Sequence, residues 1–161
     1  MGMMGAGKTT VGRAIADRTG WPYLDNDELV ELASGRSTRE VLTAGDEAAL
    51  RRVELAALDA VLDAQPPLVA SIAAGVVLDP SARGRLNDSF VVYLRATLST
   101  LTARVGAGSD RPWLGGDPAD ALGRLLDGRE AIYREVADLV LDVDTASPEE
   151  LAARVLQAVG S

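Results

Sequence analysis

The first ten residues, MGMMGAGKTT, contain the pattern G-x-x-x-x-G-K-[ST], which runs from Gly2 to Thr9. This pattern is typical of a loop that wraps its backbone N–H groups around nucleotide phosphates. The lysine of such a loop, here Lys8, reaches the β- and γ-phosphates, and Thr9 would donate its hydroxyl to Mg²⁺. All other basic residues of the chain are arginine, which indicates a need for a compact ammonium at this position. The nucleotide contacts predicted from the loop are Gly5, Ala6, Gly7, Lys8, Thr9 and Thr10.

Two carboxylates follow a short apolar segment in YLDND, at Asp25 and Asp27. The carboxyl ends of parallel strands face the ligand crevice of an open α/β sheet. There Asp25 would hold Mg²⁺ through water, and Asp27 would orient or deprotonate an acceptor hydroxyl. Taken alone, each aspartate is more often a helix cap, and only the neighbouring phosphate loop reverses that preference. Since the chain has no histidine and no cysteine, general base work falls to a carboxylate.

The elements that must position these residues follow from apolar periodicity. Short apolar runs alternate with helical patterns, and the connections between them are short, which predicts one parallel sheet in an α/β domain. The strands are expected at 21–25, from 68 onwards, at 90–94 and at 138–144. The helices are expected at 8–20, 27–35, 37–45, 46–64, 97–105, 118–137 (with a possible break at Gly128) and 147–159.

Composition limits the classes of protein to consider. The chain has 161 residues without an internal repeat or linker, so we expect a single domain over 1–161. A formal net charge of −8 argues against a nucleic-acid surface. No apolar run approaches the ~20 residues of a membrane span, and the start has no signal-peptide pattern. We therefore expect a cytoplasmic monomer whose partners are small molecules.

Other residues separate the classes of phosphate-loop protein. GTPases need an Asn-Lys-x-Asp segment for guanine, and the single lysine here is already in the phosphate loop. Motor-type ATPases place an acid at the end of an apolar strand, but LVASIAAG ends in alanines and a glycine. A small-molecule kinase, which combines Mg²⁺-bound ATP with an acceptor hydroxyl, fits the remaining pattern.

Over nearly its whole length the chain resembles the shikimate kinases, in the nucleoside-monophosphate-kinase-like branch of phosphate-loop proteins. GMMGAGKTTVGRAIA is similar to the family's phosphate loop and first helix, and YLDNDELVE to its Asp-x-Asp segment. GDEAALRRVE resembles the helix with the substrate-carboxylate arginine, DRPWL the closing lid, and REAIYREVA the segment with a second substrate arginine. The resemblance implies ATP-dependent phosphorylation of the shikimate 3-hydroxyl, with Mg²⁺ as cofactor.

The resemblance also implies a three-layer fold with strand order 2-3-1-4-5, a substrate-binding helical region at about 26–62 and a lid at about 106–117. It assigns catalysis to Lys8, Asp27 and Arg111. It adds Arg104 and Arg111 to the ATP contacts, and it implies substrate contacts from Asp27, Arg51, Ala74, Gly75 and Arg129, with Glu54 supporting Arg51.

Each arginine also has a plainer interpretation. Arg51 lies four residues after Glu47, so an ordinary ion pair on a helix surface would explain it. Arg129 and Arg134 could be solvated helix charges, and Arg104 a surface residue.

The chain departs from the family at the end of its third strand, where three glycines line the acceptor site. Here Ala73 and Ala74 replace two of them, and each added methyl occupies space beside the acceptor. The adenine-side arginine expected after the last strand is also missing. Two alternatives remain: a paralogous kinase of a related cyclitol or hydroxy acid, or a nucleotide-binding protein with little turnover.

Family members carry a short apolar strand directly before the first glycine of the loop, and only Met1 precedes it here. Our hypothesis is that Met1 marks a start placed inside this first, central strand, which is then truncated. The alternative is a true start in a fold that manages without the strand.

Overall fold

The computed structural model describes residues 1–44, 47–107 and 117–160. In chain order the elements are α1 (Lys8–Thr19), β1 (Tyr23–Asp25), α2 (Asn26–Ser34), α3 (Thr38–Thr43), α4 (Glu47–Leu62), β2 (Val69–Ser71), α5 (Pro80–Arg85), β3 (Val92–Arg95), α6 (Leu98–Ala107), α7 (Pro118–Asp127), α8 (Glu130–Val136), β4 (Leu139–Asp142) and α9 (Pro148–Val159). Single turns of 3₁₀ helix lie at Val76–Leu78 and Leu86–Asp88. This is the predicted alternation of strands and helices, with α5 as an addition that the periodicity did not indicate.

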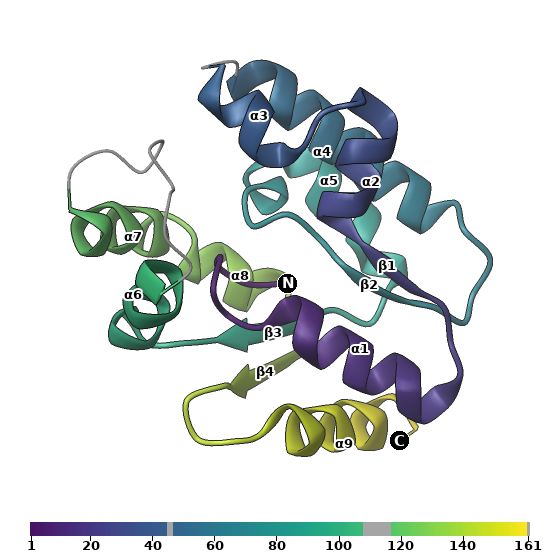
Figure 1. Ribbon diagram of the computed structural model, residues 1–161. Helices are drawn as coiled ribbons and strands as arrows, with labels where there is room; N and C mark the ends of the chain where they lie inside the picture. The colour runs from purple at the N-terminus through teal and green to yellow at the C-terminus, as the bar shows by residue number, and fades with distance from the viewer. Residues whose placement is uncertain (45–46, 108–116, 161) are drawn as a thin grey trace.

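The strands form two parallel pairs, as expected for an α/β fold. Strand β1 pairs with β2 so that Asp25 lies opposite Ser71, and β3 pairs with β4. Figure 1 shows α1 in front of the space between the two pairs, with α9 beside it and α2, α3 and α4 grouped beyond β1. The full order 2-3-1-4-5 stays a prediction, because the described strands pair only within these two sheets.

Met1 extends the edge of β3 in the way that a neighbouring parallel strand would. Its nitrogen donates to the Val92 carbonyl at 2.6 Å, and its carbonyl accepts from the Leu94 N–H at 2.9 Å. Burial, helped by the charge of Lys8, lowers the pKa of the Met1 amine to about 5. Beside it is a cavity of about 440 Å³, lined by apolar side chains from α1, α4 and α9 and by residues of β2 and β3. Met1 therefore makes the backbone contacts of a parallel strand residue beside β3.

Local signals set several helix ends. Ser147 and Glu150 form a capping box at the start of α9, where Pro148 takes the first position. The predicted break at Gly128 is confirmed, since α7 ends at Asp127 and α8 begins at Glu130. Within the described ranges, no helix is both long enough and apolar enough to cross a membrane.

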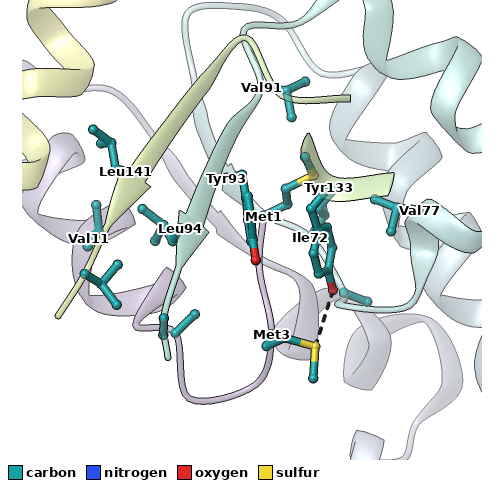
Figure 2. Packing of buried hydrophobic residues seen from close by; sticks show 14 of the residues in the cluster. Met1, Met3, Val11, Ile72, Val77, Val91, Tyr93, Leu94, Tyr133 and Leu141 are labelled. Atoms are coloured by element: carbon teal, nitrogen blue, oxygen red, sulfur yellow. Dashed lines mark hydrogen bonds between the residues drawn. The ribbon is translucent and has the colours of Figure 1, made fainter. Parts of the chain in front are cut away.

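The main apolar cluster lies between the strands and the helices that cover them. Figure 2 shows Tyr93 of β3 and Tyr133 of α8 side by side in it, with Met1 and Met3 close to both. The two rings stack at 4.8 Å between centroids and 27° between planes. A second, smaller cluster of Val30, Val41, Leu50 and Ala57 joins α2, α3 and α4. This second cluster holds the predicted substrate-binding helices together.

Candidate active site

The phosphate loop has the backbone geometry that its glycines allow. Gly5 and Gly7 have φ of 82° and 87°, in the left-handed region that favours glycine. Lys8, the first residue of α1, folds back over the loop, and its Nζ donates to the carbonyls of Gly2 and Met3 at 3.0 and 3.2 Å. The ammonium therefore lies above the loop, at the positive end of the α1 dipole, where anionic phosphate oxygens are favoured.

Asp25 lies against the start of α1 as well as at the end of β1. Its Oδ2 accepts hydrogen bonds from the hydroxyls of Thr9 at 2.9 Å, Tyr23 at 2.8 Å and Ser71 at 3.3 Å. Its Oδ1 accepts from the Asp27 N–H at 3.0 Å, so Asp25 also caps α2. Burial alone would raise the pKa of this carboxyl, but the hydrogen bonds outweigh burial and lower it. Asp25 is thus both a helix cap and an ionised neighbour of Thr9.

This pair of oxygen ligands fits a Mg²⁺ ion. In nucleotide-dependent kinases Mg²⁺ binds one or two carboxylates or hydroxyls, several waters and the phosphates of the substrate. A hydroxyl and an ionised carboxylate that are already 2.9 Å apart meet the protein's part of that requirement. In the ranges that the structure describes, no cluster of three or more acidic side chains offers an all-protein metal cage.

Arg51 pairs with a buried carboxylate of its own helix, α4. Its Nη1 lies 2.7 Å from Glu54 Oε2, and Glu54 is only 7% exposed. The guanidinium also lies directly over Gly75, because a Cβ built there would come within 2.7 Å of Arg51 Cζ. Gly75 therefore leaves the space that the guanidinium fills.

Several charged side chains influence the pKa of the buried Glu54 carboxylate. Burial raises the pKa of Glu54, whereas the positive charges of Arg51, Arg129 and Lys8 lower it and the negative charge of Asp27 raises it. Hence residues from the phosphate loop, α2, α4 and the start of α8 act on one buried carboxylate. Asp27 itself is exposed and accepts a hydrogen bond of 3.1 Å from the Thr38 hydroxyl.

The two alanines that replace family glycines have different surroundings. Ala73 is buried in the main apolar cluster, and its carbonyl accepts from Val76 N–H at 3.2 Å. Ala74 is half-buried, and its carbonyl accepts a hydrogen bond of 2.5 Å from the Tyr133 hydroxyl. Of the two, Ala74 directly precedes Gly75, over which the Arg51 guanidinium lies.

The remaining predicted residues lie on the nucleotide side. Arg104, near the end of α6, donates to the Gly5 carbonyl at 3.2 Å and so touches the phosphate loop. Thr10 is exposed on the first turn of α1. Arg134 pairs with Glu130 on the surface of α8, in agreement with the plainer interpretation. Arg111 and most of the predicted lid lie outside the described residues.

Three residues of this region were missed by sequence reasoning: Tyr23, Ser71 and Tyr133. A signal for Tyr23 was present, since it lies two residues before Asp25 and hence on the same face of β1. Ser71 reaches Asp25 through the pairing of β1 with β2, and Tyr133 reaches Ala74 across 59 positions. Neither contact has a local sequence signal.

Comparisons with known proteins give matches over nearly the whole chain. A family model of shikimate kinase matches residues 4–160. Shikimate kinases from Paramagnetospirillum magneticum and Streptomyces coelicolor are 37% and 35% identical over 99% of this chain, which spans 82% and 92% of their lengths. The structure titled shikimate kinase from Acinetobacter baumannii in complex with shikimate has a TM-score of 0.89 at 30% identity, over 98% of this chain and 89% of that one. The chain belongs to the shikimate kinase family and has its α/β phosphate-loop kinase fold.

Proposed function

We propose that this protein transfers the γ-phosphate of ATP to a hydroxyl of shikimate. The observation that carries the proposal is the Arg51 guanidinium, which pairs with the buried Glu54 and lies over Gly75. The charges of Arg129, Asp27 and Lys8 also reach Glu54. Two guanidinium groups suit the carboxylate of a small polyol, because each presents a planar fork of donors. The relative with shikimate in its solved structure supports this choice of acceptor.

In the proposed reaction the acceptor carboxylate binds Arg51 and Arg129, and its hydroxyl faces Asp27. Asp27 accepts the hydroxyl proton as the new O–P bond forms and the bond from the β,γ-bridging oxygen to the γ-phosphorus breaks, leaving ADP. Lys8 and the loop N–H groups offset the charge that develops on the transferred group. Arg111, in the lid at 106–117, would add further positive charge beside the transferred group. Helices in 26–62 would hold the acceptor.

The proposal includes a Mg²⁺ ion, which would supply positive charge to offset that of the ATP phosphates. Thr9 and Asp25 would hold it, the latter through water. Gly5, Ala6, Gly7 and Thr10 would complete the phosphate contacts, with Arg104 beside the adenine. The enzyme is proposed to be a cytoplasmic monomer without membrane partners, and a net charge of −8 disfavours a nucleic-acid partner.

The direct test is ADP release with MgATP, with and without shikimate. We expect release to depend on shikimate and to be lost with shikimate methyl ester, which keeps the hydroxyls but removes the charge that the two arginines bind. Dependence on another cyclitol or hydroxy acid instead would favour a paralogous kinase. Nucleotide binding without release for any such acceptor would identify a binding protein with little turnover.

The two alanines provide a second prediction. We expect Ala74→Gly to raise kcat/KM for shikimate up to about tenfold, because it removes a methyl beside the acceptor-side backbone. Ala73→Gly is the matched control, since its methyl is buried in the main cluster and its removal should lower the Tm without a gain in activity. Initial rates over a range of shikimate concentrations check both variants. An equal gain from Ala73→Gly would contradict the assignment of crowding to Ala74.

A further inference from the structure

Tyr133 connects two parts of the site that lie far apart in the sequence. It lies in the middle of α8, four residues after Arg129, and none of its surface is exposed. Its hydroxyl donates a hydrogen bond of 2.5 Å to the Ala74 carbonyl. Ala74 precedes Gly75, whose backbone lies against the Arg51 guanidinium. The phenol therefore ties α8 to the backbone on which Arg51 rests.

The same hydroxyl has a second neighbour. It lies 3.8 Å from Sδ of Met3 in the phosphate loop, a contact drawn as a dashed line in Figure 2. Burial raises the pKa of Tyr133 to about 12 and outweighs the positive charge of Arg129, which lowers it. The hydroxyl thus keeps its proton at neutral pH and remains a donor to Ala74. Thioether sulfur is a weak acceptor, so the contact with Met3 is the weaker of these ties.

We propose that Tyr133 is a positioning residue for the acceptor: its hydroxyl holds the Ala74–Gly75 backbone under Arg51 and anchors the turn of α8 that follows Arg129. The proposal rests on the proposed function, because it assigns both arginines to the acceptor carboxylate. Its consequence is selective. Loss of the hydroxyl should disturb the acceptor site, where both arginines lie, much more than the nucleotide site, which it meets only through Met3.

Tyr133→Phe removes this hydroxyl and keeps the ring. The matched control is Tyr93→Phe. Tyr93 stacks on Tyr133 and is equally buried. Within the described part of the chain, its hydroxyl has no hydrogen-bond partner. We expect Tyr133→Phe to raise the KM for shikimate about tenfold, the scale of leaving one buried carbonyl unpaired. The KM for ATP should stay within about twofold, and Tyr93→Phe should leave both KM values within about twofold.

Steady-state kinetics well below the Tm of each variant provide the readout. A lower Tm or maximal rate with an unchanged KM for shikimate would assign Tyr133 a purely structural role and overturn the proposal. Equal rises in both KM values, or the same rise in Tyr93→Phe, would also overturn it. If Tyr133→Phe is poorly stable, the rise in Tm caused by saturating ligand replaces the kinetics. Ligand that binds the folded protein raises its Tm by an amount that depends on the affinity. A smaller shift with shikimate and a normal shift with ATP is then the supporting result.

The parent protein separates this proposal from the proposed function. Absence of shikimate-dependent ADP release from the parent would contradict both. An active parent with an unaltered Tyr133→Phe variant would contradict only the role of Tyr133.

Discussion

Replacement of Lys8 by alanine is expected to reduce shikimate-dependent ADP release by at least about 100-fold, the scale of losing one preorganised charge donor at a transition state. The ammonium lies above the phosphate loop, 3.0 Å from the Gly2 carbonyl, where the terminal phosphates of ATP would bind. No other lysine exists in the chain to take its place. Turnover numbers at saturating ATP and shikimate measure the effect.

The fold should survive this change, because the hydrogen bonds from Lys8 to the Gly2 and Met3 carbonyls stay within the phosphate loop. Arg13→Ala is the control: it removes a positive charge from the same helix, where Arg13 pairs with Glu28 at the exposed surface. We expect near-normal turnover in that variant. Lys8→Arg should not rescue activity, since a planar guanidinium is no substitute for a compact ammonium here. Near-normal turnover in Lys8→Ala would contradict the kinase assignment.

The phosphate loop could be predicted because all of its chemistry lies in consecutive residues. Eight residues specify the turn, the lysine and the hydroxyl, and the next helix has its own periodicity. The fold was accessible for a related reason, since apolar runs and cap residues such as Ser147 are local signals. Structure that depends on neighbouring residues alone can be predicted from those residues.

The acceptor side could not be predicted in the same way. Sequence spacing offered an ordinary surface ion pair for Arg51, and it gave no sign that the guanidinium lies over Gly75 beside the buried Glu54. Which side chains of α4 meet buried partners depends on how α2, α3 and the 3₁₀ turn at Val76–Leu78 pack against it, and not on α4 alone. Here the resemblance to a family, which named Arg51 and Glu54 together, was more informative than spacing.

Replacement of Gly75 by alanine is the change with the largest effect that we expect on the acceptor side. Its Cβ would overlap the Arg51 guanidinium and lie within 2.7 Å of Cζ. Because the guanidinium is the end of a flexible side chain, we expect it to move and the backbone to stay. The displaced group would leave Glu54, with which it pairs at 2.7 Å, and would lose its place beside the acceptor carboxylate. Losing a charge-assisted contact of this kind corresponds to roughly 10- to 100-fold in kcat/KM for shikimate.

The companion variants make this prediction specific. Gly84→Ala is a matched control, since nothing lies within 4 Å of its Cβ position in α5, and it should leave kcat/KM and Tm almost unchanged. Arg51→Ala should lose about as much activity as Gly75→Ala, and the double variant little more, because both changes remove the same contact. Additive losses would instead mean that Gly75 contributes to acceptor binding independently of Arg51. Normal kcat/KM for shikimate in Gly75→Ala would show that the guanidinium does not bind the acceptor from its position over Gly75, since the added methyl cannot share that space with it.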